Sequence, residues 1–184
     1  MKRFIPVAVV LALFAVGCDE ELNPVSPTSG QVTLASQLSA AAEVPPAGSQ
    51  GNPAGALEAG ATGALSVTMV PAAAGAYTAS FTFSVGNLIK SGLLPAPLDS
   101  GSVIVAGHIH SGAAGASGPP VVPLPISQAA PIVTPTGSVT LTISNVAVSA
   151  DAGAAILANP GAFYFNLHSA LNPIGVVRGQ LARQ

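Results

Sequence analysis

The sequence predicts an all-β fold: an antiparallel, Greek-key-like sandwich or barrel of about eight strands with one short helix. Seventeen prolines and twenty glycines are spread along the 184 residues, which disfavours long helices and favours short strands joined by tight turns. Apolar and hydroxyl residues alternate along several segments, most clearly in Tyr77–Val85, as in strands with one face on a core. Stretches rich in Gly and Pro separate these segments, which is typical of sandwiches and barrels.

The chain begins with the anatomy of a secretory leader. Lys2 and Arg3 precede an apolar run over Phe4–Val16 that is too short to cross a bilayer core comfortably. The run leads to Cys18, which is the single cysteine of the sequence. Small residues before such a cysteine resemble the lipobox of bacterial lipoproteins, so we expect residues 1–17 to be a signal peptide and Cys18 to carry the lipid. An ordinary signal peptide with an incidental thiol is the alternative.

Residues 18–30 connect the leader to the domain that follows. They contain acidic residues and prolines without periodicity, so we expect the lipidated Cys18 to be followed by a flexible, solvated tether. Each buried acyl methylene contributes about 0.8 kcal/mol, so several chains on one cysteine hold a protein firmly at a membrane. The expected location is the extracytoplasmic side of a bacterial cell envelope, lipid-anchored, with inner and outer membrane both left open.

Composition also excludes two features. Charged residues make up 7% of the chain, and its five basic residues are dispersed. Recognition of a phosphate backbone needs clustered Lys and Arg, so nucleic acid is not an expected partner. A single cysteine excludes a disulfide within the chain.

Residues 31–184 are expected to form one β-rich domain. Its strand candidates, in chain order, are Val32–Leu38, Leu65–Met69, Tyr77–Val85, Ser102–His110, Val121–Ile126, Val139–Ser144, Ala162–His168 and Val176–Leu181. One helix is expected over Ser149–Ala158, where Ser149 can cap the first turn and Asn159-Pro160-Gly161 ends it.

Four fragments follow one another in the order of a known family. They are Leu38–Pro46, Gly107–His110, Gly118–Val122, and Phe163–His168 continuing through Asn172-Pro173 to Arg178–Leu181. Together they resemble the chordin (CHRD) domain of many bacterial secreted proteins, over about residues 32–184. The resemblance implies an extracytoplasmic β-rich module without an established enzymatic reaction. Two departures are visible: Val176 stands where the family commonly has Glu, and residues 111–118 lengthen the turn after the histidine pair.

The three histidines are the main candidates for a site. His108 and His110 lie two positions apart on an expected strand, so their side chains leave the same face with Cα atoms roughly 6.6 Å apart. His168 ends another expected strand and shares one face of it with Tyr164 and Asn166. If the two strands are neighbours, the three imidazoles form a site suited to Zn²⁺ or Cu²⁺.

Two functions remain open for these residues. The first is a membrane-anchored binding or structural module, in which the histidines, Tyr164 and Asn166 form a hydrogen-bonded polar cluster. The second is a metal-binding protein with superoxide-dismutase-like activity, because a His-x-His pair on an antiparallel strand is similar to the copper–zinc dismutases, although their further ligands are missing here. No nucleophile–base pair is visible beyond the imidazoles, which argues against an enzyme. Neither a ligand, a protein partner nor an oligomeric state is predicted.

Glu43 and Arg178 are isolated charges in apolar surroundings. A fold that brings the first and last strands together would join them as an ion pair, because a buried Arg needs such a partner. Two unrelated surface charges are the alternative.

Overall fold

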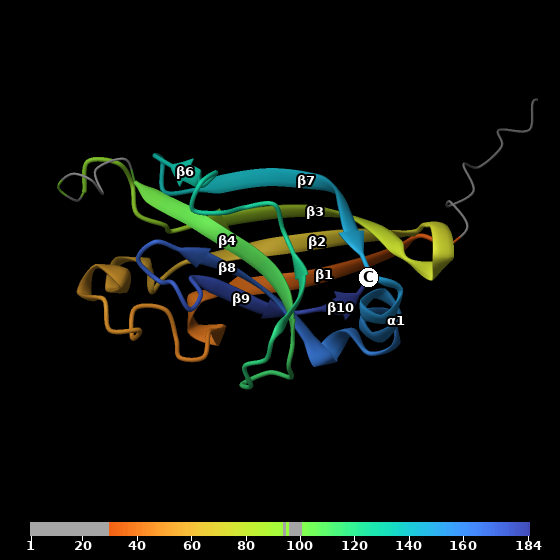
Figure 1. Ribbon diagram of the computed structural model, residues 1–184. Coiled ribbons are helices and arrows are strands. Elements are labelled where there is room, and N and C mark those ends of the chain that lie inside the picture. Colours follow the sequence, from red (N-terminus) through yellow and green to blue (C-terminus); the bar gives the residue numbers. More distant parts are fainter. Residues whose placement is uncertain (1–29, 94, 96–100) are drawn as a thin grey trace, which may run out of the picture.

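Antiparallel strands curl into a near-closed barrel with one short helix near one end (Figure 1). The computed structural model describes residues 30–93, 95 and 101–184. The predicted signal peptide, Cys18 and the tether up to residue 29 lie outside the described residues. Within the described ranges, no helix combines the length and the apolar character needed to cross a membrane.

Eight strands follow one another around the barrel in the order β5-β4-β8-β9-β1-β2-β3-β7, and two short strands pair beside this path. The strands are β1 (Val32–Ser39), β2 (Thr62–Pro71), β3 (Tyr77–Gly86), β4 (Ser102–Ser111), β5 (Pro120–Pro123), β6 (Ile132–Thr134), β7 (Val139–Val148), β8 (Phe163–Ser169), β9 (Val177–Gln180) and β10 (Ala182–Arg183). The predicted all-β class is confirmed, and of the sandwich and the barrel the chain forms the barrel.

Several strand boundaries differ from the prediction. Strand β2 extends beyond Leu65–Met69 at both ends, and the strand predicted over Val121–Ile126 ends at Pro123. Strand β7 was expected to end at Ser144 but continues to Val148. A register shift against β3 interrupts β7, and Asn145 there has a φ of 61°. Such a bulge inserts a residue and moves the following side chains to the other face, so the period-two pattern stops. Strands β6 and β10 have three and two residues, too few for a periodic signal.

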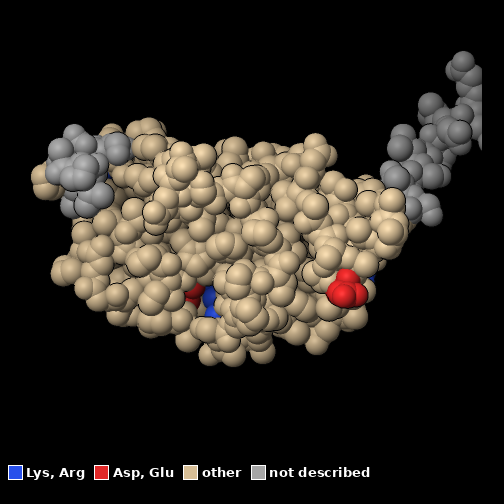
Figure 2. Space-filling view, viewed as in Figure 1, with Lys and Arg blue, Asp and Glu red and all other residues tan. Residues whose placement is uncertain are grey.

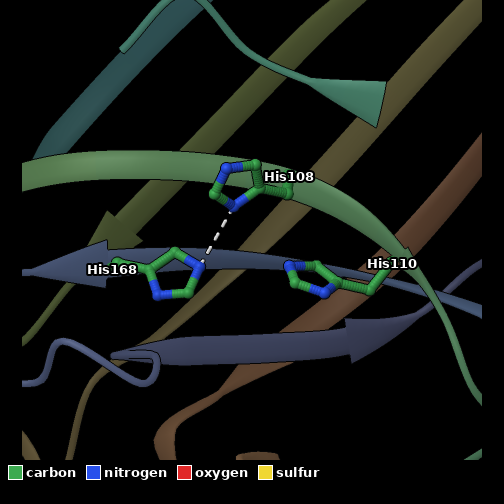
Figure 3. A group of neighbouring side chains, drawn as sticks. All are labelled: His108, His110 and His168. Carbon is green, nitrogen blue, oxygen red and sulfur yellow. Dashed lines mark hydrogen bonds between the residues drawn. The ribbon is translucent and has the colours of Figure 1, made fainter. Parts of the chain in front are cut away.

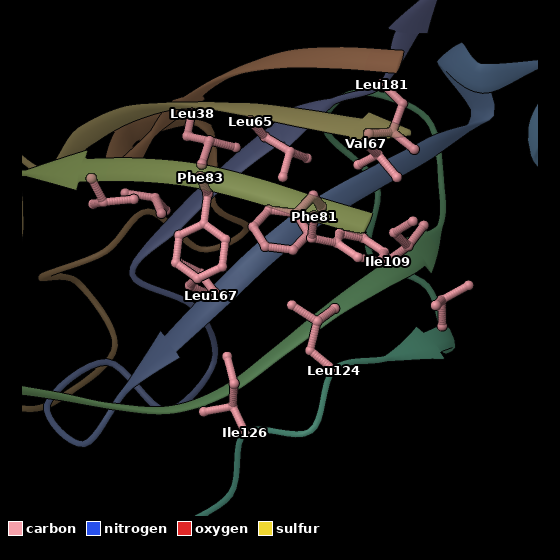
Figure 4. Packing of buried hydrophobic residues seen from close by; sticks show 14 of the residues in the cluster. Leu38, Leu65, Val67, Phe81, Phe83, Ile109, Leu124, Ile126, Leu167 and Leu181 are labelled. Atoms are coloured by element: carbon pink, nitrogen blue, oxygen red, sulfur yellow. The ribbon is translucent and has the colours of Figure 1, made fainter. Parts of the chain in front are cut away.

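The barrel interior is filled by the alternate, inward-facing residues of the strands (Figure 4). Phe165 of β8 lies with its ring centroid 6.1 Å from Phe81 and 5.9 Å from Phe83, both on β3. These aromatic rings are 1% exposed or less. Burying each such side chain stabilises the fold by about 1.5–3 kcal/mol, which forces the intervening polar residues of the same strands outward.

The predicted helix is confirmed as α1 (Ala150–Ala158). The Ser149 side chain accepts a hydrogen bond from the backbone N–H of Ala152 at 3.3 Å, as expected of an N-cap. Ile156 anchors the helix because it is fully buried against the barrel. Short 3₁₀ turns occupy the connections at Ala40–Ala42, Pro53–Glu58, Ala73–Gly75 and Pro160–Ala162.

Candidate metal centre

The register of the sheet gathers polar side chains on the outer face of β4, β8 and β9. Across these strands His108 lies opposite Asn166, and Asn166 lies opposite Arg178. In the next row, His110 lies opposite Tyr164. Directly opposed residues have Cβ atoms about 4.5–5.5 Å apart, so the side chains of each row can touch.

The apolar neighbours explain why these residues face outward. Ile109, between the two histidines of β4, is buried in the core, and so are Phe165 and Leu167 on either side of Asn166. Turning either strand over would place imidazoles among the core side chains and leave large apolar groups in water. The alternation therefore sends His108, His110 and His168 to the same outer face.

The three imidazoles converge there (Figure 3). His108 Nδ1 lies 3.2 Å from His168 Nε2. The ring centroid of His108 is 5.2 Å from that of His110 and 5.1 Å from that of His168. One ligand nitrogen from each ring can be chosen so that all three lie within 4.8 Å of one another. The expectation that every histidine of the chain gathers at one place is confirmed.

Two backbone carbonyls fix the tautomers of this group. His110 Nδ1 lies 2.8 Å from the carbonyl oxygen of Gly118, and His168 Nδ1 lies 2.9 Å from that of Pro173. A carbonyl oxygen can only accept, so each Nδ1 donates and each Nε2 presents a lone pair. His168 Nε2 therefore accepts a hydrogen bond from His108 Nδ1. If the His108 proton moves from Nδ1 to Nε2, then His108 Nδ1 also presents a lone pair, and all three rings can act as ligands.

The three histidines are uncharged at neutral pH. Burial lowers the pKa of His108 to about 4, and the neighbouring His168 and His110 lower it further. Burial also lowers the pKa of His110 and of His168, although the carbonyls of Gly118 and Pro173 oppose the shift. Neutral imidazole is the form that binds metal, so little competition from protons is expected above pH 7.

The distances suit a metal ion after a small adjustment. Zn–N bonds of about 2.0–2.1 Å in a tetrahedral site place neighbouring ligand nitrogens about 3.3 Å apart. His108 Nδ1 and His168 Nε2 are already at 3.2 Å, so the His110 ring is the one that has to approach. Its Nε2 atom is buried without a hydrogen-bond partner among the described residues. A metal ion would supply the partner that this lone pair lacks.

Tyr164, on strand β8 between β4 and β9, packs against the histidine group. Its ring stacks on His110, with centroids 5.0 Å apart and planes 11° from parallel. The Arg178 guanidinium carbon lies 3.4 Å from the centroid of the same ring, a cation–π contact. The Tyr164 hydroxyl and His110 Nδ1 both lie against the backbone of Gly118. That residue has to be glycine, because a Cβ there would collide with the carbonyl of Ser111.

Glu43 and Arg178, the predicted ion pair, lie at one hollow beside the histidines. Arg178 Nη2 donates to the carbonyls of Ala113 and Ala116 at 2.9 and 2.8 Å. Burial raises the pKa of Glu43 to about 8, against the opposing effects of nearby Asn166 and of the Arg178 charge. Among the described atoms no hydrogen bond or close ion-pair contact joins the two side chains, so their interaction acts across a gap.

Comparison with known families matches residues 34–181 to the CHRD domain. The chain belongs to the CHRD family. The matched range contains the three histidines, Glu43 and Arg178, so the candidate metal centre lies within the CHRD domain. No curated protein and no solved structure matches the chain.

Sequence reasoning missed a buried network that holds one loop of the CHRD domain over the histidines. Glu58, which is fully buried, accepts hydrogen bonds from Ser169 at 2.5 Å and from Asn172 at 2.9 Å. Asn172 also bonds the backbone of Gly48 and Gly55 through its side chain. This network fastens residues 170–175, which supply the Pro173 carbonyl to His168. More than a hundred residues separate Glu58 from Ser169 and Asn172, and no local pattern indicates the contact.

Proposed function

We propose that this CHRD domain binds a divalent transition metal ion, Zn²⁺ or Cu²⁺, through His108 Nδ1, His110 Nε2 and His168 Nε2. The observation that carries the proposal is the convergence of three neutral imidazoles, two of them held by backbone carbonyls with a lone pair turned inward. Backbone carbonyls that accept from the opposite ring nitrogen orient histidine ligands in metal sites. A purely structural cluster would not need to bury the His110 Nε2 lone pair without a partner beside two further imidazoles.

The donor set suggests the class of metal site. Imidazole nitrogen suits zinc and copper, whereas magnesium and calcium take oxygen ligands. Three protein ligands leave one position of a tetrahedral ion for water or a small ligand, as in sites that act on bound molecules. A metal in this position would act as a Lewis acid toward whatever fills the fourth place. Dismutase-like activity is a prediction for the copper-loaded site alone, because it requires a metal that changes oxidation state and zinc does not.

We further propose that the lipid on Cys18 holds the domain at a membrane of a bacterial envelope. The leader anatomy before Cys18 supports this location, as does the tether composition after it. A metal-binding module at that surface would meet metal ions outside the cytoplasm.

Metal analysis tests the binding proposal. Protein stripped with EDTA and then loaded with Zn²⁺ or Cu²⁺ should retain close to one equivalent after gel filtration. His110→Ala and His168→Ala should each lose it, while Tyr164→Phe, which keeps the stacked ring on the same face, should retain it. Retention well below one equivalent in the unaltered protein would favour a binding or structural module without a metal.

A further inference from the structure

The hollow beside the histidines is the second feature of this face that points to a ligand. Figure 2 shows an acidic and a basic side chain next to each other in a recess of an otherwise nearly uncharged face. The recess has a volume of about 370 Å³, and Glu43 and Arg178 are the charged residues that line it. Gln37, Gln180 and the loop residues Ala114 and Gly115 are among the other residues of the wall. Ligand sites commonly begin near this size.

Both charged side chains carry polar atoms that nothing described in the chain engages. Glu43 is 3% exposed and Arg178 is 2% exposed. The Glu43 Oε1 atom is sealed from water and has no hydrogen-bond partner among the residues described. Arg178 uses Nη2 for the two loop carbonyls, and its Nε and Nη1 groups make no hydrogen bond within the described residues. A buried cation with unused N–H donors therefore lines the hollow.

The electrostatics favour an anion in this place. A buried guanidinium is always charged and is stable only when a counter-charge or several acceptors surround it. Arg178 has two carbonyls and the Tyr164 ring, but these acceptors are neutral. Burial raises the pKa of Glu43 to about 8, so the adjacent carboxyl is protonated at neutral pH and does not neutralise the guanidinium. The hollow carries one net positive charge and one neutral acid group.

We propose that the hollow binds a small organic monocarboxylate, with one carboxylate oxygen on Arg178 and the other on Glu43. The ligand accepts hydrogen bonds from the free guanidinium N–H groups, and the protonated Glu43 donates to it. Charge-assisted bonds of this type are roughly twice as strong as neutral ones. A monoanion matches the single positive charge, and a carboxylate has two acceptor oxygens for two donors on opposite sides of the hollow. This inference goes beyond metal binding and does not depend on it.

The test uses the full-length protein in detergent after EDTA treatment, so no metal takes part. Propionate, at about pH 7 and therefore below the pKa of Glu43, is titrated by calorimetry and by broadening of its ¹³C-carboxyl resonance. Propionamide has the same size without the charge and should bind at least about tenfold more weakly. Arg178→Gln should lose at least about tenfold in propionate affinity, whereas the matched change Arg183→Gln, at an exposed site, should not.

Arg178→Gln also removes the hydrogen bonds to the loop carbonyls of Ala113 and Ala116, so a loss of binding could come from a displaced loop. Two further variants separate these causes. Ala114→Phe places a large side chain in the wall of the hollow at an exposed position and keeps the Arg178 side chain, so it should also abolish binding. His168→Ala should bind propionate as the unaltered protein does, so a failed metal centre leaves this result intact. Equal binding of propionate and propionamide would overturn the proposal, as would undiminished propionate binding to Ala114→Phe. Tighter binding of inorganic phosphate would overturn the assignment to a monocarboxylate.

Discussion

Replacing Glu43 by Gln should change how the stability of the protein depends on pH. The carboxyl is buried, and its pKa rises from 4.5 to about 8 on folding because burial disfavours the charged form. Gln keeps the size and a hydrogen-bond donor but cannot ionise. The comparison therefore isolates the free energy that this one proton contributes.

The sign follows from proton binding in the two states. Below about pH 4.5 the group is protonated in both the folded and the unfolded chain, and the variant should be about as stable as the unaltered protein. Between pH 4.5 and 8 the folded state keeps the proton that the unfolded state loses, so stability falls as the pH rises. Each pKa unit corresponds to about 1.36 kcal/mol, so by pH 8 the advantage of Glu43→Gln should be on the order of 4 kcal/mol.

Urea unfolding of EDTA-treated protein, followed by far-UV circular dichroism across this pH range, measures the effect. The control is His108→Gln, because the pKa of His108 is lowered from 6.5 to about 4 and its dependence has the opposite sign. As the pH drops from 6.5 toward 4, His108 binds a proton in the unfolded chain but not in the folded one, so the stability falls. His108→Gln should therefore flatten the stability curve between pH 6.5 and 4. Parallel curves for Glu43→Gln and the unaltered protein would mean that Glu43 titrates normally in the fold, contrary to its burial.

Three further predictions concern the anchor and the loop over the histidines. Cys18→Ala should release the protein from the membrane fraction, and unchanged retention would remove the lipid anchor. Gly175→Ala should destabilise the fold by about 1–3 kcal/mol in urea unfolding, because a Cβ on this residue, whose φ is 157°, would collide with the Glu43 carboxyl. Gly60→Ala is the control, because open space surrounds Gly60. Equal urea midpoints for the two variants would contradict the close contact between Gly175 and Glu43. Asn172→Ala should lower Zn²⁺ affinity about tenfold or more in a chelator competition although it touches no histidine, and an unchanged affinity would show that the loop needs no such support.

Much of the fold could be predicted because its strands obey a simple period. Tyr77–Gly86 alternates without interruption, and the structure makes it a complete strand. The start of the helix was also predictable from neighbouring residues, because Ser149 is a typical N-cap residue and caps α1 in the structure. The strand predicted to end at Ser144 continues to Val148 as β7. The bulge at Asn145 depends on pairing with β3, so no pattern in the neighbouring residues indicates that the strand goes on. The choice between barrel and sandwich depends on how the whole sheet curls, which no single segment encodes.

The candidate site was predictable to the extent that it follows from alternation. His108 and His110 share a face because they are two apart, and His168 shares a face with Tyr164 for the same reason. The hydrogen-bond partners were not predictable. The carbonyls of Gly118 and Pro173 belong to loops, and any residue type presents the same carbonyl group. The burial of Glu43 likewise depends on a distant glycine at position 175, so its raised pKa has no signature near it in the sequence.

The most direct measurement is a crystal structure of Zn²⁺-loaded protein with anomalous data collected at the zinc edge. We expect one strong peak about 2.0–2.1 Å from His108 Nδ1, His110 Nε2 and His168 Nε2, with the carbonyls of Gly118 and Pro173 still accepting from the opposite ring nitrogens. A loaded crystal with no peak between the three rings, or with the metal on the Nδ1 atom of His110, would contradict it.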